Sequence, residues 1–336
     1  KRTPFTEAEM ARIQQVAGEM DFALLWLPDP SYTPMEEVGA FVAAPDRAAV
    51  IAGYPLDISP ATDDQPFFFN LVRFGDLLDT SLSASGVYRT SMEAILILGI
   101  VLGVTALLGA LFVLLPLGLG ARRRELARPP AGLLAYFACL GIGFMVVEIP
   151  LIQRLTVYLG RPVYSLAIVL FSLLLFSGLG SLWIGQRARG EGTPPLTRIF
   201  TLLMAFVGLH AVVVPWLLGG TVGWPLGARL AITVALLAPL GFLMGMPFPL
   251  GMRWAGLQKP GVVPWLWGVN GVTSVMGSAL GIAMAIHIGF RAVLLIGAGI
   301  YGLAGLLISR QVRKAARAQT AAPELSPRVI DPSTAG

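Results

Sequence analysis

Long runs of apolar residues dominate the chain from about residue 94 onward. A helix formed by such a run, at about 1.5 Å per residue, is long enough to cross the roughly 30 Å hydrocarbon core of a membrane. Seven runs follow one another, over residues 94–115, 131–152, 163–185, 199–218, 226–250, 266–288 and 292–309. The pattern predicts an all-α polytopic membrane bundle of about seven transmembrane helices, occupying residues 94–309.

Residues 1–75, which precede the bundle, show shorter and mixed patterns. Thr6 and Glu9 form a capping box, which predicts a helix to about residue 20. The run FALLWL at 22–27, ended by prolines, is typical of a buried strand, and a second capping pattern predicts a helix over 33–43. Because so short an α/β segment without disulfides buries only a small core, we interpret residues 1–75 as the C-terminal end of a larger domain.

Residues 54–70 contain three prolines, at positions 55, 60 and 66, which exclude a regular helix. The adjacent acids Asp63 and Asp64 allow two interpretations. Either they serve as turn and cap residues before the aromatic run FFF packs, or they form the acidic wall of a site for a cationic substrate. Residues 76–93 are predicted to be a connector to the membrane.

The composition supports a membrane protein and excludes several other classes. Hydrophobic residues make up 55% of the chain and charged residues only 13%, and the mean hydropathy is +0.74. The net charge of +5 resides in short clusters between apolar runs, which argues against a nucleic-acid partner. With Cys139 as the only cysteine and two histidines, we expect no metal site.

The distribution of basic residues between the loops predicts the orientation of the bundle. One set of alternate loops carries most of the arginines and lysines, for example Arg122 to Arg124 and Arg310 to Lys314. The positive-inside rule therefore predicts a cytoplasmic C-terminus, and seven crossings then leave the N-terminal region outside. The tail 310–336 begins basic and becomes rich in polar residues and proline, which predicts disorder.

The second apolar run contains an acid, Glu148, which is costly inside hydrocarbon and usually faces a bundle interior or a wet cavity. Pro150 predicts a kink nearby, and Gln153 and Arg154 follow almost at once. We expect the Glu148 carboxylate to pair with Arg154 or to accept a hydrogen bond from another helix. Its role is either to fix helix contacts or to serve a proton relay or cation site.

Polar and small residues in the later runs predict close helix packing. Asn270, Ser274 and Ser278 recur every four residues, so they share one helix face as an interhelical polar stripe or a substrate path. Prolines 247 and 249 predict a break in the fifth helix. Small residues also recur four apart, which favours packing within the chain, with homodimerisation as the alternative; the pairs are Gly99/Gly103, Ser177/Ser181, Gly241/Gly245 and Gly277/Gly281.

Several motifs together carry a resemblance to a known family: SPATDDQPFFF at 59–69, GFMVVEI at 143–149 with QR at 153–154, YSL at 164–166, FSGLGS at 176–181, MPFP at 246–249 and WGVNG at 267–271. The chain resembles the C-terminal half of bacterial multi-pass membrane proteins classed as spermidine synthase-like. In that family a Rossmann-like domain, similar to aminopropyltransferases and methyltransferases, is flanked by transmembrane helices. Gln65 stands where the family commonly has arginine, and Arg161 where it commonly has histidine.

The resemblance implies an enzyme whose active site precedes this chain. S-adenosylmethionine or its decarboxylated form is the implied cofactor of the full-length protein, and no cofactor-binding residue is expected in this chain. The chain starts at Lys1 without a signal peptide, which also predicts that it continues a longer polypeptide. The implied location is the bacterial inner membrane, but a cytoplasmic cofactor conflicts with the outside placement of the N-terminal region.

Two functional hypotheses follow. In the first, the bundle anchors the transferase domain and delivers a lipid-soluble or cationic substrate to it, with the bilayer and the upstream half of the polypeptide as its partners. In the second, the bundle is a transporter for a polyamine, another cation or a proton. The candidate intramembrane polar site consists of Glu148, Gln153, Arg154, Asn270 and Ser274, and the candidate acidic loop of Asp63 and Asp64.

Overall fold

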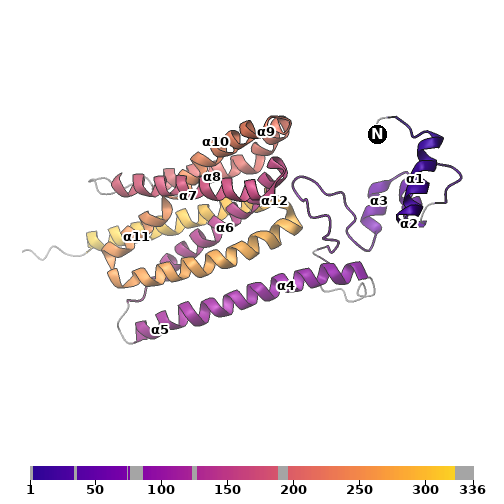
Figure 1. The fold of residues 1–336 in the computed structure, drawn as a ribbon. Helices are drawn as coiled ribbons and strands as arrows, with labels where there is room; N and C mark the ends of the chain where they lie inside the picture. The colour runs from indigo at the N-terminus through magenta and orange to yellow at the C-terminus, as the bar shows by residue number, and fades with distance from the viewer. Residues whose placement is uncertain are drawn as a thin grey trace, which may run out of the picture. The chain divides into compact units, whose positions relative to one another are not determined.

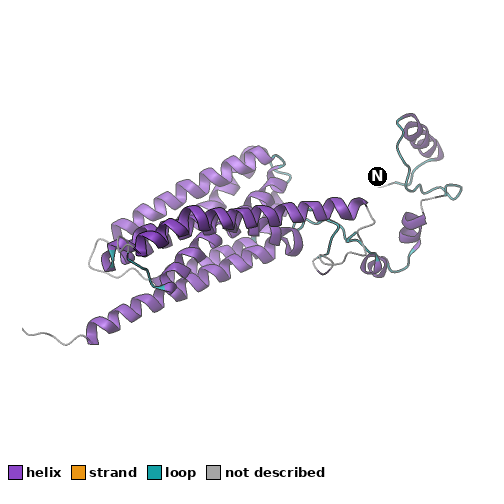
Figure 2. Ribbon diagram, turned by 90° about the horizontal axis from the view of Figure 1, so that it is seen from below, coloured by secondary structure: helices purple, strands orange, loops and turns teal. Residues whose placement is uncertain are grey.

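The computed structural model describes residues 3–33, 36–73, 75, 86–122, 127–187 and 196–321. Helices account for the regular structure of these ranges, and no strand forms among them (Figure 2). The chain divides into two compact units, one of Lys1–Pro60 with Phe69–Ser91 and the other of Ala61–Phe68 with Met92–Gly336. The short segment Ala61–Phe68 therefore packs with the bundle, although it lies between stretches of the N-terminal unit.

The N-terminal unit contains three short helices: α1 (Glu7–Glu19), α2 (Glu36–Ala43) and α3 (Arg47–Gly53). The predicted capping box of α1 is confirmed, because Thr6 and Glu9 each accept from the other's backbone N–H. The second predicted helix is also confirmed, as α2, although part of its capping motif lies outside the described residues. Residues 54–70 contain no helix, as their prolines predict.

The strand predicted for residues 22–27 does not form. A strand requires a partner for its backbone N–H and C=O groups, and no described segment of the N-terminal unit pairs with this run. Leu27 is buried, whereas Phe22 is 63% exposed and Leu25 50% exposed. The α/β character of this unit is therefore not observed in the structure.

The bundle consists of long helices that run alongside one another (Figure 1). Five of its helices are long and apolar enough to cross a membrane, or six if the bent pair α8–α9 forms one span. The helices are α4 (Gly86–Gly109) continued by η3 (Ala110–Leu114) and α5 (Leu115–Arg122), then α6 (Ala131–Leu159), α7 (Pro162–Arg187), α8 (Leu196–Val212), α9 (Val214–Thr221), α10 (Leu226–Met244), α11 (Pro247–Gln258), the short η4 (Pro260–Val262) and α12 (Val263–Ala321).

Helical geometry is interrupted at three places: within α12, between α8 and α9, and between α10 and α11. α12 leaves helical geometry at Gly289, whose φ of 79° and ψ of 163° suit glycine almost alone. α8 and α9 meet at Val213 with a bend of 43°. The break predicted at Met246 is confirmed, because α10 ends at Met244 and α11 starts at Pro247. Tyr136 of α6 donates a hydrogen bond of 2.7 Å to the Pro247 carbonyl at this break.

Small residues allow close approach of helices within the chain. A Cβ atom on Gly245 would collide with the Ser177 backbone, and one on Gly277 would lie 2.9 Å from Cα of Ile142. The packing predicted for those pairs is thus confirmed. Gly99 and Gly103 of α4 differ, because nothing lies within 4 Å of a Cβ at either position. Further along α4, Gly109 packs against Val272 of α12.

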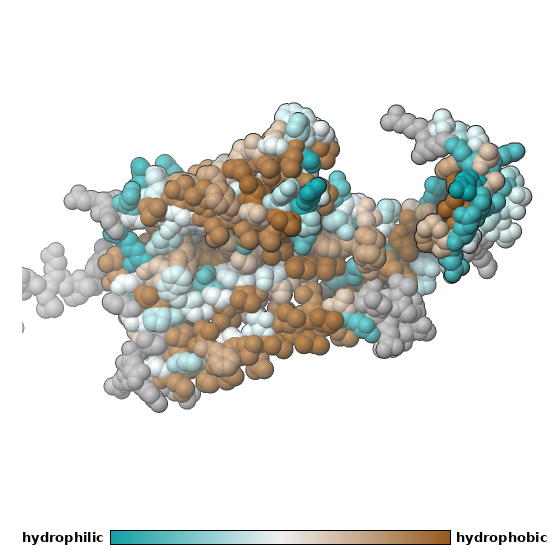
Figure 3. Space-filling view, viewed as in Figure 1, coloured by the Kyte–Doolittle hydropathy of each residue, from teal (hydrophilic) through white to brown (hydrophobic). Residues whose placement is uncertain are grey.

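Apolar residues cover much of the face of the bundle that Figure 3 shows. Side chains of α4 illustrate this: Leu107 is 65% exposed and Phe112, in η3, 69% exposed. Exposed apolar area of this extent is expected for helices that contact lipid and is costly in water. The structure therefore defines a multi-pass α-helical membrane protein.

Two predicted boundaries need correction. The last eight residues of the predicted connector 76–93 are helical, since α4 begins at Gly86; residues 76–85 lie outside the described ranges. The tail predicted to be disordered from residue 310 continues α12 as far as Ala321. Its sequence there is rich in alanine, arginine, lysine and glutamine, which favour helix, and it lacks proline up to residue 323.

Candidate functional site

A short turn of the chain docks against one end of the bundle. In this turn Thr62 and Gln65 form an isolated antiparallel bridge, with backbone N···O distances of 3.3 and 3.0 Å. The Thr62 hydroxyl also accepts a hydrogen bond of 3.1 Å from the Gln65 N–H. Because the turn satisfies its own backbone groups, the intervening residues Asp63 and Asp64 are free to make contacts elsewhere.

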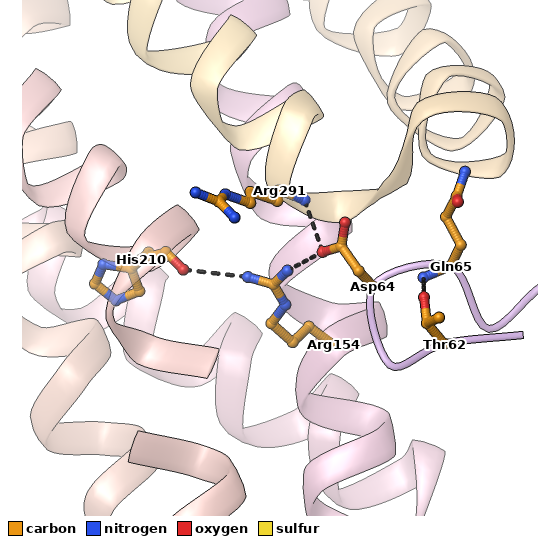
Figure 4. Close-up of polar contacts among 6 residues, drawn as sticks. All are labelled: Thr62, Asp64, Gln65, Arg154, His210 and Arg291. Carbon is orange, nitrogen blue, oxygen red and sulfur yellow. Dashed lines mark hydrogen bonds and ion pairs between the residues drawn. The ribbon is translucent and has the colours of Figure 1, made fainter. Parts of the chain in front are cut away.

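Asp64 connects this turn to two helices of the bundle (Figure 4). Its carboxylate forms an ion pair with the Arg154 guanidinium, and its Oδ1 also accepts a 3.0 Å hydrogen bond from the Arg291 backbone N–H. The Asp64 backbone carbonyl accepts a 3.0 Å bond from the Phe290 N–H. The loop is therefore held to α6 and to α12 at the break that Gly289 creates. We name these contacts the Asp64 clamp.

Arg154 occupies a nearly buried position, with 6% of its surface exposed. Besides Asp64, its guanidinium donates a 3.2 Å hydrogen bond to the backbone carbonyl of His210 in α8. Its charged end also lies 5.9 Å from the ring centroid of Phe290, which in turn packs edge-on against Phe67 at 5.6 Å. Polar and aromatic contacts thus join the loop to α6, α8 and α12.

A cleft of about 420 Å³ opens beside the Asp64 clamp. One wall is polar and comes from the docked turn, Arg154 and Arg291; the other is apolar and comes mainly from the ends of α6 and α8 and from α9. The lining residues are Thr62, Asp63, Asp64, Arg154, Val157, Tyr158, Ala211, Val212, Pro215, Trp216, Leu218, Gly219, Val222 and Arg291. Its volume suits a small ligand or part of a larger one.

The charges of the cleft are nearly balanced. Asp64 is neutralised by Arg154, whereas Asp63 is exposed and has no hydrogen-bond or ion-pair partner among the described residues. The Arg291 side chain is exposed at the other edge. A cleft with one free carboxylate, one guanidinium and an apolar wall is suited to an amphiphilic ligand. Asp63 and Asp64 both line the cleft, where they share it with the Arg154 and Arg291 guanidinium groups, and their role as an acidic wall for a cationic substrate stays a prediction.

The structure brings together only some of the predicted site residues. It joins Asp64 with Arg154, but the predicted pairing of Glu148 with Arg154 does not form. Six residues along a helix turn a side chain by about 120° and advance it by about 9 Å, so the two point in different directions. Gln153 is partly buried and does not line the cleft.

Glu148 lies inside the bundle, away from the cleft. It is 5% exposed, and no hydrogen bond or ion pair engages its carboxylate within the described ranges. Its neighbours Val146 and Val147 are fully buried, and a Cβ atom on Gly297 of α12 would lie 2.7 Å from the Val147 side chain. Glu148 therefore belongs to the packed interior between α6 and α12 rather than to the cleft.

The predicted polar stripe of α12 is confirmed at one position only. The Asn270 amide donates a 3.1 Å hydrogen bond to the Phe137 carbonyl of α6. Ser274 and Ser278 instead donate to carbonyls of their own helix, those of Asn270 and Val275, at 2.9 and 2.8 Å. A serine hydroxyl in a helix reaches its preceding turn easily, which satisfies it without a second helix. Of these three residues, Asn270 is therefore the one whose side chain forms a hydrogen bond between α12 and α6.

Two residues of the site escape prediction from the sequence. Arg291 follows the Gly289 break and contributes its backbone N–H to Asp64, and His210 contributes only a carbonyl to Arg154. Every non-proline residue has a backbone N–H and a carbonyl, so the residue type at these positions does not predict either contact. The combination of a glycine with an arginine two residues later, between two apolar runs, is the one available signal for Arg291.

No group of three or more histidine, cysteine, aspartate or glutamate side chains suited to a metal ion occurs in the part of the chain that the structure describes. Comparison with known proteins finds no matching family model, no matching curated protein and no matching solved structure.

Proposed function

We propose that this chain is the membrane half of a spermidine synthase-like transferase, and that it anchors the catalytic domain and presents an amphiphilic, lipid-soluble substrate at the cleft. The single observation that carries the proposal is the Asp64 clamp, which ties the segment Ala61–Phe68 to the bundle beside the cleft. An anchor without a substrate role would not need a cleft at its point of attachment.

The chemistry of the cleft supports an amphiphile over a free polyamine. A polyamine requires several carboxylates, but Asp64 is already paired with Arg154, which leaves Asp63 as the free acid of the described lining. The apolar wall includes Trp216, which is 83% exposed and suited to the membrane interface. A molecule with an apolar body and a charged end matches both walls.

The N-terminal unit supports its interpretation as the end of a larger domain. Phe22, Leu25 and Trp26 are 63%, 50% and 41% exposed in the strand-like run 22–27. A neighbouring strand in an α/β domain would pair with this run and bury those side chains. We propose that an upstream Rossmann-like domain supplies this strand, together with the site for S-adenosylmethionine or its decarboxylated form.

We also propose seven membrane crossings, formed by α4–α5, α6, α7, α8–α9, α10–α11 and the two parts of α12 on either side of Gly289. The break supports this count, because an unbroken helix of 59 residues would extend about 88 Å, almost three bilayer cores. Under this arrangement the cleft and the C-terminus lie on opposite sides of the membrane, and the loop charges favour a cytoplasmic C-terminus.

A transfer assay with the complete polypeptide in proteoliposomes tests the proposal. The protein receives donors labelled in the transferable group, S-adenosylmethionine or its decarboxylated form, and the lipid-soluble and aqueous products are separated. We expect label in the lipid-soluble fraction, reduced severalfold by Asp64→Asn and unchanged by the control Asp57→Asn in the N-terminal unit. Absence of transfer from both donors would refute the transferase, and equal behaviour of the two variants would refute the role of the clamp.

Transport is a second candidate, favoured by one observation: the buried Glu148 carboxylate has no ion-pair partner in the described residues. An intramembrane acid of this kind is common in proton and cation pathways. Uptake of labelled spermidine or of protons into proteoliposomes tests this candidate, and Glu148→Gln is expected to abolish it. Equal uptake by the native protein and the variant would exclude Glu148 from a transport path.

A further inference from the structure

A second concave site lies between α8 and the C-terminal part of α12. It measures about 550 Å³ and is lined by Thr197, Phe200, Thr201, Met204, Gly302, Gly305, Leu306, Ser309, Arg310 and Arg313. None of these residues lines the cleft beside the Asp64 clamp. Arg310 follows Arg291 by nineteen residues, or about 28 Å of helix, so the two sites lie near opposite ends of the last helical segment. We name it the α8–α12 groove.

The shape of the groove follows from two glycines. A Cβ atom on Gly302 would lie 3.0 Å from the Met204 sulfur, and one on Gly305 would lie 2.8 Å from the Phe200 ring. The absence of side chains at these positions lets residues of α8 sink into the surface of α12. Met204 and Leu306 remain exposed, at 39% and 59%. The apolar part of the groove is therefore accessible from the outer surface of the bundle.

The end of the groove nearest the C-terminus of α12 is polar and positively charged. Arg310 and Arg313 lie one turn apart on α12, both exposed and without a hydrogen-bond or ion-pair partner among the described residues. The lining also includes two residues with hydroxyl groups, Thr197 and Ser309. Thr197 belongs to the first turn of α8, where the helix dipole adds partial positive charge.

The chain supplies little negative charge to balance these arginines. No aspartate or glutamate occurs between Glu191 and Glu324, a stretch that includes every residue of the groove. The groove has two guanidinium groups at one end, and the rest of its lining is mainly apolar. It is therefore complementary to a molecule with an anionic headgroup and a hydrocarbon chain.

We propose that the α8–α12 groove binds an anionic phospholipid, such as phosphatidylglycerol. Its phosphate contacts Arg310 and Arg313 with the hydroxyls of Thr197 and Ser309, and one acyl chain lies along Gly302, Gly305 and Leu306. Basic pockets between transmembrane helices bind anionic lipid headgroups, because guanidinium groups form bidentate hydrogen bonds with phosphate. The proposal is independent of the transferase and transport hypotheses.

Lipid titration followed by native mass spectrometry of the full chain, in a zwitterionic detergent, tests this proposal. We expect phosphatidylglycerol to bind at least about tenfold more tightly than phosphatidylcholine, and the double variant Arg310→Gln/Arg313→Gln to weaken its binding about 10- to 30-fold. The matched control Arg253→Gln removes a charge from exposed α11, outside the groove, and should change the affinity by less than about threefold.

Equal affinity for the two lipids, or an equal loss in Arg253→Gln, would overturn the proposal, because the effect would then be a general response to surface charge. Displacement of the lipid by inorganic phosphate at comparable concentration would also overturn it, because the groove would then recognise the free anion. Photo-crosslinking gives a second measurement: a benzophenone residue in place of Leu306, which lines the groove, should capture the anionic lipid. The same residue in place of exposed Leu303, outside the lining, should capture it far less.

Discussion

Replacement of Asp64 by asparagine is the most informative perturbation of this molecule. Asparagine has nearly the same shape and keeps one oxygen that can accept the 3.0 Å hydrogen bond from the Arg291 N–H. The change removes the negative charge that faces Arg154 and replaces the second carboxylate oxygen by an NH2 group. Because Arg154 is 6% exposed, its guanidinium would then be buried without a counter-ion, with only neutral acceptors near it among the described residues: the asparagine oxygen and the His210 carbonyl, at 3.2 Å.

The expected size of the effect follows from the burial of the two partners. Removal of one partner of a fully buried ion pair costs about 3–5 kcal/mol, because the other charge stays desolvated. The side chain of Asp64 is 39% exposed, whereas that of Arg154 is 7% exposed, so water screens part of the interaction. We therefore expect Asp64→Asn to destabilise the docked loop and bundle by about 1–3 kcal/mol.

Cys139 provides the assay. It is the only cysteine and lies half-buried in α6, so a thiol-reactive fluorogenic dye reports thermal unfolding of the bundle in detergent. Four proteins complete a double-mutant cycle: the native chain, Asp64→Asn, Arg154→Met and the double variant. We expect Asp64→Asn to lower the unfolding midpoint more than Arg154→Met does, since only the former leaves a buried charge without a counter-ion.

The double variant decides whether this reasoning is correct. If an unpaired Arg154 charge causes the loss, the additional change Arg154→Met should restore most of the stability lost in Asp64→Asn. A double variant no more stable than Asp64→Asn would refute the electrostatic explanation. An unchanged midpoint in Asp64→Asn would show that the ion pair contributes nothing to the docking of the loop.

Three further predictions concern the helix contacts, all measured with the same thiol assay. Gly289→Ala should cost about 1–3 kcal/mol because its backbone region is almost exclusive to glycine, and retention of the native midpoint would contradict this. Gly245→Ala should destabilise strongly, since its Cβ collides with Ser177, while the control Gly99→Ala, with open space around it, should be neutral; similar shifts in both would exclude packing as the cause. Asn270→Ala should cost about 0.6 kcal/mol, the average for an interhelical hydrogen bond in a membrane, and a loss several times larger would point to a role beyond that bond.

Local features of the fold are predictable where local physics determines them. The capping box of α1 depends on Thr6 and Glu9 alone, and the break before α11 depends on missing N–H donors at Pro247 and Pro249. The failed strand at residues 22–27 shows the limit of this reasoning, because a strand depends on a partner that the run itself cannot supply. The continuation of α12 beyond residue 310 shows that charge alone does not end a helix.

The candidate site was predictable in its components but not in their pairing. Asp64 lies in the proline-rich segment 54–70 and Arg154 directly follows an apolar run, so both charged residues stand out in the sequence. Ninety positions separate the two, and Glu148, a nearer acid, offers an equally plausible partner by sequence alone. Helix rotation directs Glu148 into the interior and Arg154 toward the docked loop, and only the packed arrangement fixes that choice.

The sequence by itself determined that this protein is a helical membrane bundle, because the length and apolar character of each run meet the demands of hydrocarbon without reference to any other run. It also marked helix faces that pack closely, such as those of Gly245 and Gly277, since small side chains permit such contact, although the same pattern at Gly99 and Gly103 of α4 meets open space. The tertiary structure alone decided that the Thr62–Gln65 turn docks at the Gly289 break, that Asp64 neutralises Arg154, and that a cleft and a basic groove open near opposite ends of the last helical segment. Those features arise from contacts between distant segments, and their energies depend on burial and direction, which no single stretch of the chain encodes.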